Sequence, residues 1–218
     1  MLGKKWIAAL IMLALSSSLL AAEQQVFRDY FAALPLFWQQ VYPDGGNTLY
    51  CGQHFAQDQR RDINVEHVYP MAWVMSSLGC RSRDACRRKS PRFNQIESDM
   101  HNLFPAREDI NRIRGSAPFD IIPGEARRFG HCDFEFDTRK RRAEPAPAAR
   151  GEIARAMFHM QESYGLKIFR RQGEMLQRWN REDPPDQEEQ RRNTVIEKLQ
   201  GTRNRFIDDP EAAAKLRF

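Results

Sequence analysis

The stretch NVEHVYP at residues 64–70 decides the interpretation of the whole sequence. Its β-branched and apolar residues predict a short strand over residues 63–69, which Pro70 limits at its carboxyl end. Two adjacent titratable residues, Glu66 and His67, lie within this strand. Neighbouring side chains of a regular strand point to opposite faces, so both can serve one site only at a strand end or a β-bulge. The pair alone also fits a structural histidine beside a surface glutamate.

Two further polar segments follow downstream. The first, NQIESDMHNL at residues 94–103, carries Glu97 and other polar residues among few apolar ones. The second, residues 107–114, predicts a short helix that carries Asn111 and ends at Gly115. A capped polar helix and an exposed charged turn have similar compositions. Neither segment is therefore diagnostic by itself.

Arginine is concentrated between the NVEHVYP stretch and the first of these polar segments. Residues 80–92 are interpreted as an arginine-rich loop, whose guanidinium groups suit bidentate contact with phosphate. The candidate contacts to nucleic acid in this loop are Arg81, Arg87 and Arg88. A solvated charged face is the alternative interpretation of such a run. The formal net charge of +5 is too small to decide between them.

The remaining sequence predicts one helix-rich α+β domain over residues 23–218, with a few short strands. The strongest helix prediction covers residues 151–164, where apolar residues recur at helical spacing. Further helices are expected at residues 24–42 with a break at Pro35, 71–78, 166–179 and 193–199. The other expectations are a strand at 48–55, a hairpin within 124–137, a segment at 93–103 that Pro105 stops, and fraying of the last dozen residues.

The first 22 residues have the layout of a secretory signal peptide. Lys4 and Lys5 precede an apolar run at residues 6–20, and the small residues Ala21 and Ala22 follow. The apolar run is short for a membrane-spanning helix, although an uncleaved anchor is the alternative. We therefore expect a periplasmic or secreted protein with no stable membrane association after cleavage of the signal.

Four cysteines lie in the mature part of the chain. An even number of cysteines in an exported protein favours disulfides. Four residues allow three pairings, and we favour a short loop closed by Cys80 and Cys86 with a long closure between Cys51 and Cys132. A structural zinc site that uses Cys80 and Cys86 is the competing interpretation.

Taken together and in this order, the motifs resemble the endonuclease I family of exported bacterial nucleases. This family belongs to the wider His-Me, or ββα-metal, finger group. The matching segments are VEHVYP at residues 65–70, ESDMHNL at 97–103, AEP at 143–145 and ARGEIAR at 149–155. The resemblance covers nearly all of the mature chain and implies a ββα-metal finger active site.

The resemblance implies a role for each matching residue. Glu66 and Asn111 correspond to the protein ligands of a divalent metal ion, and His67 corresponds to the general base. Arg83 corresponds to an arginine that holds the scissile phosphate, and Glu97 to a second acidic residue of the active site. The equal spacing from Arg83 to Glu97 and from Glu97 to Asn111 is that of the family pattern.

Elementary chemistry agrees with these roles. A neutral histidine can accept a proton from water near neutral pH. Carboxylate and amide oxygens suit Mg²⁺, with Ca²⁺ or Mn²⁺ as alternatives. Phosphate contacts carry no direct sequence information, so we expect cleavage of DNA and RNA with little sequence preference and with 5′-phosphate ends.

Three expectations complete the functional prediction. We interpret His101 and Asn102 as structural residues. We expect the protein to act as a monomer. A catalytically inactive, exported nucleic-acid-binding protein is the alternative function, but it would not need His67, Glu66 and Asn111 together.

Overall fold

Helix α6 (Arg150–Tyr164) forms the centre of the molecule in the computed structural model, which describes residues 23–124 and 128–218. Most of its residues are buried, including Ile153 and Met157, because its apolar stripe faces the largest core cluster. Gly151 permits a close approach to the chain, since a Cβ there would lie 1.9 Å from the carbonyl oxygen of Asp183. The helix predicted at residues 151–164 is confirmed.

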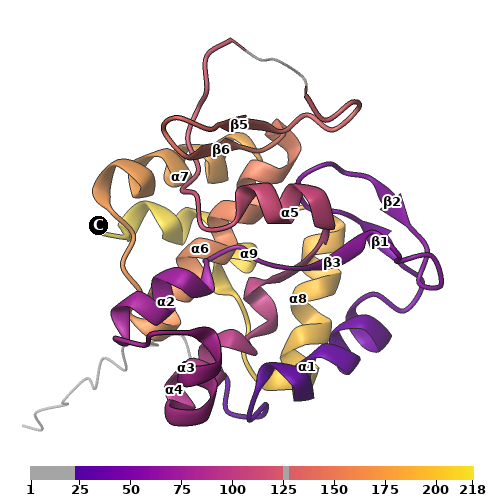
Figure 1. The fold of residues 1–218 in the computed structure, drawn as a ribbon, viewed down its shortest axis with the longest axis vertical. Helices are drawn as coiled ribbons and strands as arrows, with labels where there is room; N and C mark the ends of the chain where they lie inside the picture. Colours follow the sequence, from indigo (N-terminus) through magenta and orange to yellow (C-terminus); the bar gives the residue numbers. More distant parts are fainter. Residues whose placement is uncertain (1–22, 125–127) are drawn as a thin grey trace, which may run out of the picture.

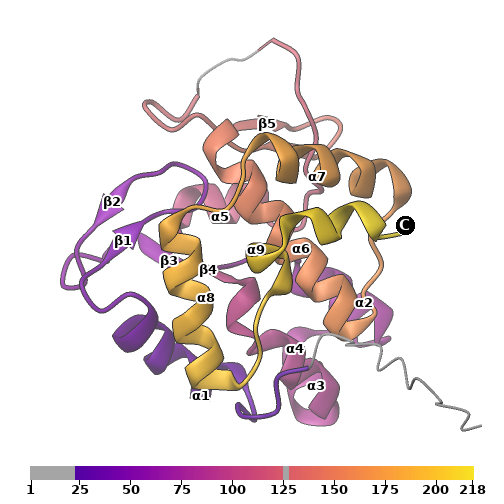
Figure 2. The same cartoon turned by 180° about the vertical axis from the view of Figure 1, so that it is seen from behind.

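The other long helices pack around α6. Helix α7 (Arg170–Glu182) lies along it, and α9 (Arg205–Asp208) also contacts it. Figure 2 shows α8 (Gln187–Gln200) and the 3₁₀ helix at Pro210–Lys215 near the viewer, on the face opposite to α5. The last dozen residues were expected to fray. They instead include this 3₁₀ helix, whose Ala212 and Ala213 are buried in the core.

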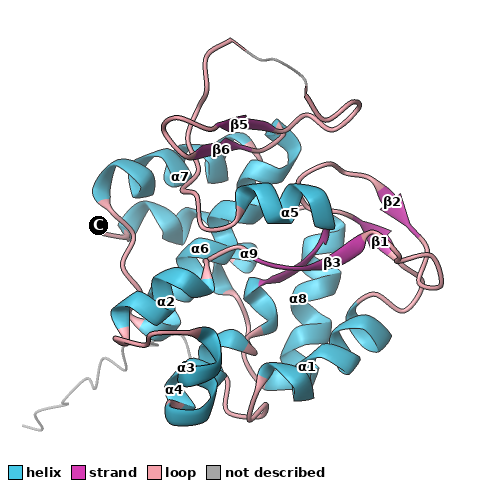
Figure 3. Cartoon of the chain, in the orientation of Figure 1, coloured by secondary structure: helices cyan, strands magenta, loops and turns pink. Residues whose placement is uncertain are grey.

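The described residues form three two-stranded antiparallel sheets, and helices predominate around them (Figure 3). Their strands are β1 (Gly46–Asn47) with β2 (His54–Phe55), β3 (Ile63–His67) with β4 (Leu103–Arg107), and β5 (Glu135–Asp137) with β6 (Arg142–Glu144). In the central pair, Glu66 lies opposite Phe104 and His67 opposite Leu103. Helix α5 (Glu108–Arg114) follows β4 directly and ends at Gly115, as predicted. The whole is a helix-rich α+β domain.

Short helices cover one end of the β3–β4 pair. Figure 1 shows α2 (Met71–Ser77), α3 (Arg83–Lys89) and α4 (Pro91–Glu97) below it, between the two strands in chain order. Helix α1 (Tyr30–Leu36) lies beside them and continues as a π-helix at Phe37–Val41. A 3₁₀ turn at Met100–Asn102 then leads into β4.

Two sequence predictions near the central strands are wrong. The arginine-rich segment predicted as a loop forms helix α3, because Ser82 caps its first turn by accepting from the Ala85 amide. Arginine is also a good helix former. Pro105 does not stop a segment but lies inside β4, opposite Val65. A two-stranded ribbon has only edge strands, so a residue without an N–H can be accommodated there.

Several predicted boundaries also differ from the structure. Of the strand expected at residues 48–55, only His54–Phe55 is a strand, and the residues before it form the turn between β1 and β2. The hairpin lies at residues 135–144 instead of 124–137. Pro35 lies within α1 and does not break it. Helix α7 lies four residues downstream of its predicted start at 166, and α8 begins six residues before the predicted 193. Helix α7 has no side-chain cap to mark its start, whereas Asp186 caps α8 by accepting from the Glu189 amide, a local signal that the prediction missed.

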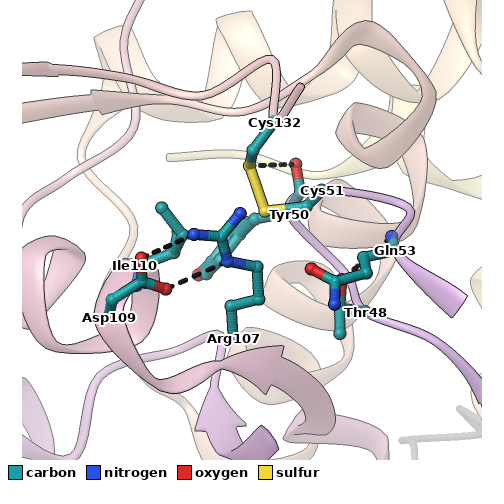
Figure 4. Close-up of a disulfide and its surroundings, with 8 residues drawn as sticks. All are labelled: Thr48, Tyr50, Cys51, Gln53, Arg107, Asp109, Ile110 and Cys132. Carbon is teal, nitrogen blue, oxygen red and sulfur yellow. Dashed lines mark hydrogen bonds and ion pairs between the residues drawn. A yellow bond between two sulfur atoms is a disulfide. The ribbon is translucent and has the colours of Figure 1, made fainter. Parts of the chain in front are cut away.

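The cysteines pair as favoured from the sequence. Cys80 pairs with Cys86 across six residues, and Cys51 pairs with Cys132 across 81 residues. No free cysteine remains, so the zinc interpretation is wrong. Figure 4 shows the long-range bridge beside Tyr50, where it ties the segment before β2 to the loop before β5.

The predicted signal peptide at residues 1–22 lies outside the described residues. Within residues 23–124 and 128–218, no helix has the length and apolar character needed to cross a bilayer.

Candidate active site

A cleft with a volume of about 560 Å³ opens where strand β3 ends. Four of the predicted site residues line it: Glu66, His67, Arg83 and Asn111. They come from β3, α3 and α5, so the cleft depends on how the β3–β4 pair positions the helices around it. The fifth predicted residue, Glu97, lies behind the cleft and is fully buried.

His67 is the last residue of β3 and is 8% exposed. Its Nε2–H donates to the carbonyl oxygen of Glu97 at 2.9 Å, because a carbonyl can only accept. The neutral imidazole therefore carries its lone pair on Nδ1. Burial, aided by the positive charge of Arg83, lowers the pKa of His67 to about 3. The side chain is thus neutral at physiological pH and can accept a proton.

Glu66 is 3% exposed and is held by two donors. The Tyr50 hydroxyl and Nη1 of Arg114 each donate to its Oε1, both at 2.6 Å. Oε2 takes no side-chain hydrogen bond from the described residues. Burial raises the pKa of Glu66, although Arg114 and Tyr50 oppose this effect.

Asn111 faces the same cleft from helix α5. Its Nδ2 donates to Oδ1 of Asn64 at 2.8 Å and to the carbonyl of Val65 at 3.2 Å. These bonds fix the amide with its nitrogen towards β3. Within the described part of the chain, Oδ1 has no hydrogen-bond partner and can act as a ligand atom.

The position of Glu66 and His67 at the end of β3 explains how two adjacent residues can both line the cleft. Glu66 bonds to Tyr50 and to Arg114 of α5, whereas His67 bonds to Glu97 at the end of α4. The two side chains thus keep the alternation of a regular strand, and the β3–β4 register is continuous to His67. The strand end, and not a β-bulge, allows both to reach the cleft.

Glu97 organises the arginines beside the cleft. Its carboxylate pairs with Arg83 through Oε1 and with Arg87 at 2.8 Å through Oε2. The Arg83 side chain is still 40% exposed and can present its remaining N–H groups to an anion. Glu97 thus fixes His67 by its backbone and Arg83 by its side chain. This geometry makes it a positioning residue.

The predicted nucleic-acid contacts on and before α3 have different surroundings. Arg81 and Arg88 are exposed. Arg87 is largely occupied by Glu97, and its guanidinium carbon lies 4.8 Å from the ring centre of Phe31. Arg81 and Arg88 therefore remain the freer candidates for phosphate contacts.

Sequence reasoning missed three residues that shape the cleft. Arg114 is fully buried and also donates to the carbonyls of His67 and Val68. Tyr50 holds Glu66, and the Tyr30 ring lies 5.3 Å from the His67 ring. The neighbouring sequence of Arg114, in a charged helix, and of Tyr50, before a cysteine, gives no indication of these contacts. Only tertiary structure brings them to the site.

The donor set fits a hard divalent cation. Glu66 offers an anionic oxygen and Asn111 a neutral amide oxygen, both on the wall of a solvent-accessible cleft. Mg²⁺ prefers such oxygens and keeps several water ligands, so two protein ligands suffice. The cysteines are all in disulfides, so thiolate ligands for a softer metal are absent from the chain.

Comparison with known proteins decides the family. The model of the family described as Endonuclease I matches residues 22–211. The chain belongs to the endonuclease I family. It is therefore a hydrolase of the endonuclease class, as the sequence motifs predicted.

Curated relatives of this endonuclease support the assignment. It is 33% identical to a periplasmic deoxyribonuclease of Aeromonas hydrophila, over 95% of each chain. It is 39% identical to an extracellular deoxyribonuclease of the same organism, over 78% of this chain and 75% of the relative. An extracellular ribonuclease of Bacillus subtilis is 31% identical over 55% of this chain and 46% of its own. The predicted periplasmic or secreted location is confirmed by the first two relatives.

Asp99, His101 and His159 form a second cluster in this endonuclease, with ligand atoms within 4.8 Å of one another. Each Asp99 oxygen already accepts two hydrogen bonds: Oδ1 from the His101 amide and Gln200, and Oδ2 from Tyr164 and His159. His101 in turn bonds through Nε2 to the carbonyl of Thr202. The cluster joins three chain segments in the core, namely residues 99–101, helix α6 and residues 200–202, and these contacts give it a structural role.

Asn102 has a similar structural role. Its Oδ1 accepts from the Tyr69 amide at 2.6 Å, and its Nδ2 donates to the Tyr69 carbonyl at 3.0 Å. The side chain thus satisfies both backbone groups of Tyr69, just beyond the end of β3. It holds the segment that carries His67 in place.

We expect Asp99 to make stability depend on acid pH. Burial alone would raise the pKa of Asp99, but His159 and the hydrogen bonds outweigh it and hold the pKa well below the usual range. This contribution is present above the unfolded pKa of about 3.9 and is lost as pH falls below it. Asp99→Asn should lower the free energy of unfolding at pH 7 by about 1–3 kcal/mol and flatten its decline below pH 4.

Urea unfolding at several pH values tests this expectation. Asp44→Asn, at an exposed aspartate, is the control and should leave the pH profile unchanged. An Asp99→Asn protein with the wild-type stability and pH profile would contradict the structural role of the cluster.

Proposed function

We propose that this endonuclease hydrolyses the phosphodiester bonds of DNA and RNA in a metal-dependent reaction, with little sequence preference, and leaves 5′-phosphate ends. The observation that carries the proposal is the convergence in one cleft of a neutral His67, oxygens of Glu66 and Asn111, and the exposed part of Arg83. The relatives named as deoxyribonucleases and as a ribonuclease support both substrate classes. In this assignment β3, β4 and α5 form the ββα-metal finger.

His67 acts as the general base. Its Nδ1 takes a proton from the attacking water, whose oxygen forms the new bond to phosphorus. The Nε2–H remains bonded to the Glu97 carbonyl, which fixes the ring and stabilises the positive charge that develops on it. The bond from phosphorus to the 3′ oxygen breaks, so the upstream fragment leaves with a 3′ hydroxyl that takes its proton from water, and the phosphate stays on the 5′ end of the downstream fragment.

Arg83 and the cation ligands compensate charge. Arg83 donates hydrogen bonds to the non-bridging oxygens of the scissile phosphate, and Glu97 keeps its guanidinium in place. A bound Mg²⁺, or Ca²⁺ or Mn²⁺ in its place, supplies Lewis-acid stabilisation of the leaving oxygen. Glu66 and Asn111 would hold this ion, and Tyr50 and Arg114 orient Glu66.

Backbone contacts account for low sequence preference. Arg81 and Arg88 are exposed just before and on α3, the helix that brings Arg83 to the cleft, and we propose that they pair with phosphates flanking the cleaved bond. We propose that the protein binds nucleic acid as a monomer through these contacts. Cleavage should then fall steeply as salt concentration rises.

A digestion series tests the proposed function. Supercoiled DNA, linear DNA, single-stranded DNA and RNA are incubated with Mg²⁺, Ca²⁺, Mn²⁺ or a chelator, and the product ends are mapped by ligation. We expect nicking and fragmentation of all four substrates with a divalent ion, 5′-phosphate ends, and no cleavage in chelator. Binding without cleavage under every condition would instead identify a nucleic-acid-binding protein.

Tyr50→Phe should weaken binding of the divalent ion. The change removes one hydroxyl donor from Glu66 and leaves the aromatic packing intact. Loss of such a supporting contact commonly reduces metal affinity or activity about 10- to 100-fold. We expect the Mg²⁺ concentration for half-maximal activity to rise by about tenfold or more.

Tyr69→Phe is the matched control. Its hydroxyl donates to the carbonyl of Lys167, away from Glu66, so the Mg²⁺ requirement should remain that of the wild type. Equal Mg²⁺ requirements for Tyr50→Phe and the wild type would show that Glu66 does not depend on this hydroxyl.

A further inference from the structure

A second groove, with a volume of about 780 Å³, lies next to the active-site cleft. No described residue lines both, but two segments of the chain contribute to each. Helix α2 contributes Met71 and Met75 to the cleft and Trp73 to the groove. The segment after α5 contributes Ser116 to the cleft and Phe119 to the groove. In Figure 1 the chain leading into α7 passes beside α2, and Phe169 of this segment lines the groove. A strand that leaves the cleft across α2 would therefore enter this groove.

The groove exposes large apolar side chains. Phe169, just before α7, is 65% exposed, and Ile121 is 46% exposed. Trp73 is half-buried and stands at 88° to the Tyr69 ring, which fixes its orientation. Adjacent exposed apolar groups of this size indicate a binding surface more often than solitary ones do.

Positive charge surrounds these apolar side chains. The lining contains Arg142, Arg171 and Arg178 and a single carboxylate, that of Asp120. Asp120 pairs with Arg171 at 3.1 Å and, more loosely, with Arg142 at 3.8 Å. Arg178 makes no ion pair with any residue that the structure describes. The ammonium of Lys167 also lies 4.7 Å from the Phe169 ring centre.

We propose that this groove binds unpaired nucleobases of a single strand next to the scissile phosphate. The inference rests on the proposed nuclease function and specifies its substrate. Aromatic side chains inside a cationic groove are the common means of holding single strands, because each base has a face that can stack and each phosphate a negative charge. Bases in a duplex are already stacked and cannot reach Phe169 or Trp73. The groove therefore favours single-stranded DNA and RNA over duplex.

Paired binding measurements test the proposal without cleavage. Fluorescence anisotropy in chelator gives the Kd of a single-stranded oligonucleotide and of its duplex for each variant. Phe169→Ala should weaken single-strand binding by about tenfold, and Phe169→Leu nearly as much, because leucine keeps apolar volume but not the aromatic face. Duplex binding should change by less than about twofold.

Two arginines on α7 provide a matched comparison. Arg178→Ala should weaken single-strand binding, whereas Arg181→Ala should not, because Arg181 is exposed on the same helix but does not line the groove. Circular dichroism confirms the fold of each variant.

Three results would overturn the groove proposal: unchanged single-strand binding by Phe169→Ala, equal losses for single strand and duplex, or equal effects of Arg178→Ala and Arg181→Ala. Failure of the nuclease proposal has a different signature, namely no cleavage of any substrate with any metal. Because binding is measured in chelator, the two failures are distinguishable.

Discussion

Replacement of His67 by alanine is expected to lower kcat/KM for plasmid DNA by about 10²–10⁴-fold. The change removes the neutral imidazole that lines the cleft at the end of β3. It leaves Arg83, Glu66 and Asn111 in place, so substrate and metal binding should persist. Initial rates of nicking at saturating Mg²⁺ measure the loss, and anisotropy with a duplex measures binding separately.

His54→Ala is the control for this substitution. His54 is exposed on β2 and lines no part of the cleft, so its variant should cleave at the wild-type rate. A His67→Ala enzyme within about twofold of the wild type would exclude His67 as the general base.

Removal of the Cys51–Cys132 bridge is expected to have the largest effect on stability. A bridge across 81 residues restricts the unfolded chain far more than one across six residues. The chain-entropy relation gives about 4.5 kcal/mol for the long loop and about 2 kcal/mol for the short one. The double change Cys51→Ser with Cys132→Ser should thus lower the free energy of unfolding about twice as much as Cys80→Ser with Cys86→Ser.

Removal of the Cys51–Cys132 bridge should also affect metal binding at the active site. Cys51 follows Tyr50, whose hydroxyl holds Glu66, so loosening this segment should raise the Mg²⁺ requirement as well. Urea unfolding under non-reducing conditions gives the stabilities, and Mg²⁺ titration of activity gives the second effect. A larger stability loss for the Cys80–Cys86 pair would contradict the entropic argument.

The sequence predicted those parts of the fold that depend on local patterning. The apolar stripe of α6 and the C-terminal glycine of α5 are local signals, and both elements form as expected. Pro105 and the arginine-rich α3 misled the prediction, because local rules for proline and charge do not include the partner strand or the Ser82 cap. Tertiary context overrides propensity at these positions.

In the candidate site, too, the residues that belong to local motifs were predicted and those placed by tertiary contacts were not. Glu66, His67, Arg83 and Asn111 were identified from motifs, and the structure brings them into one cleft. Arg114 was not identified, because a buried arginine that joins Glu66 to the backbone of β3 differs in no local way from an exposed one. Contacts between distant segments must be seen in three dimensions.

The central claim is that oxygens of Glu66 and Asn111 hold a divalent cation beside His67. Isothermal titration calorimetry with Mg²⁺ tests it most directly, on the wild type, Glu66→Gln, Asn111→Ala and the control Glu108→Gln, whose carboxylate lines the same cleft. The account predicts one Mg²⁺ site in the wild type and in Glu108→Gln, and an affinity at least tenfold lower in each of the other two variants. Wild-type affinity in Glu66→Gln and Asn111→Ala would contradict it.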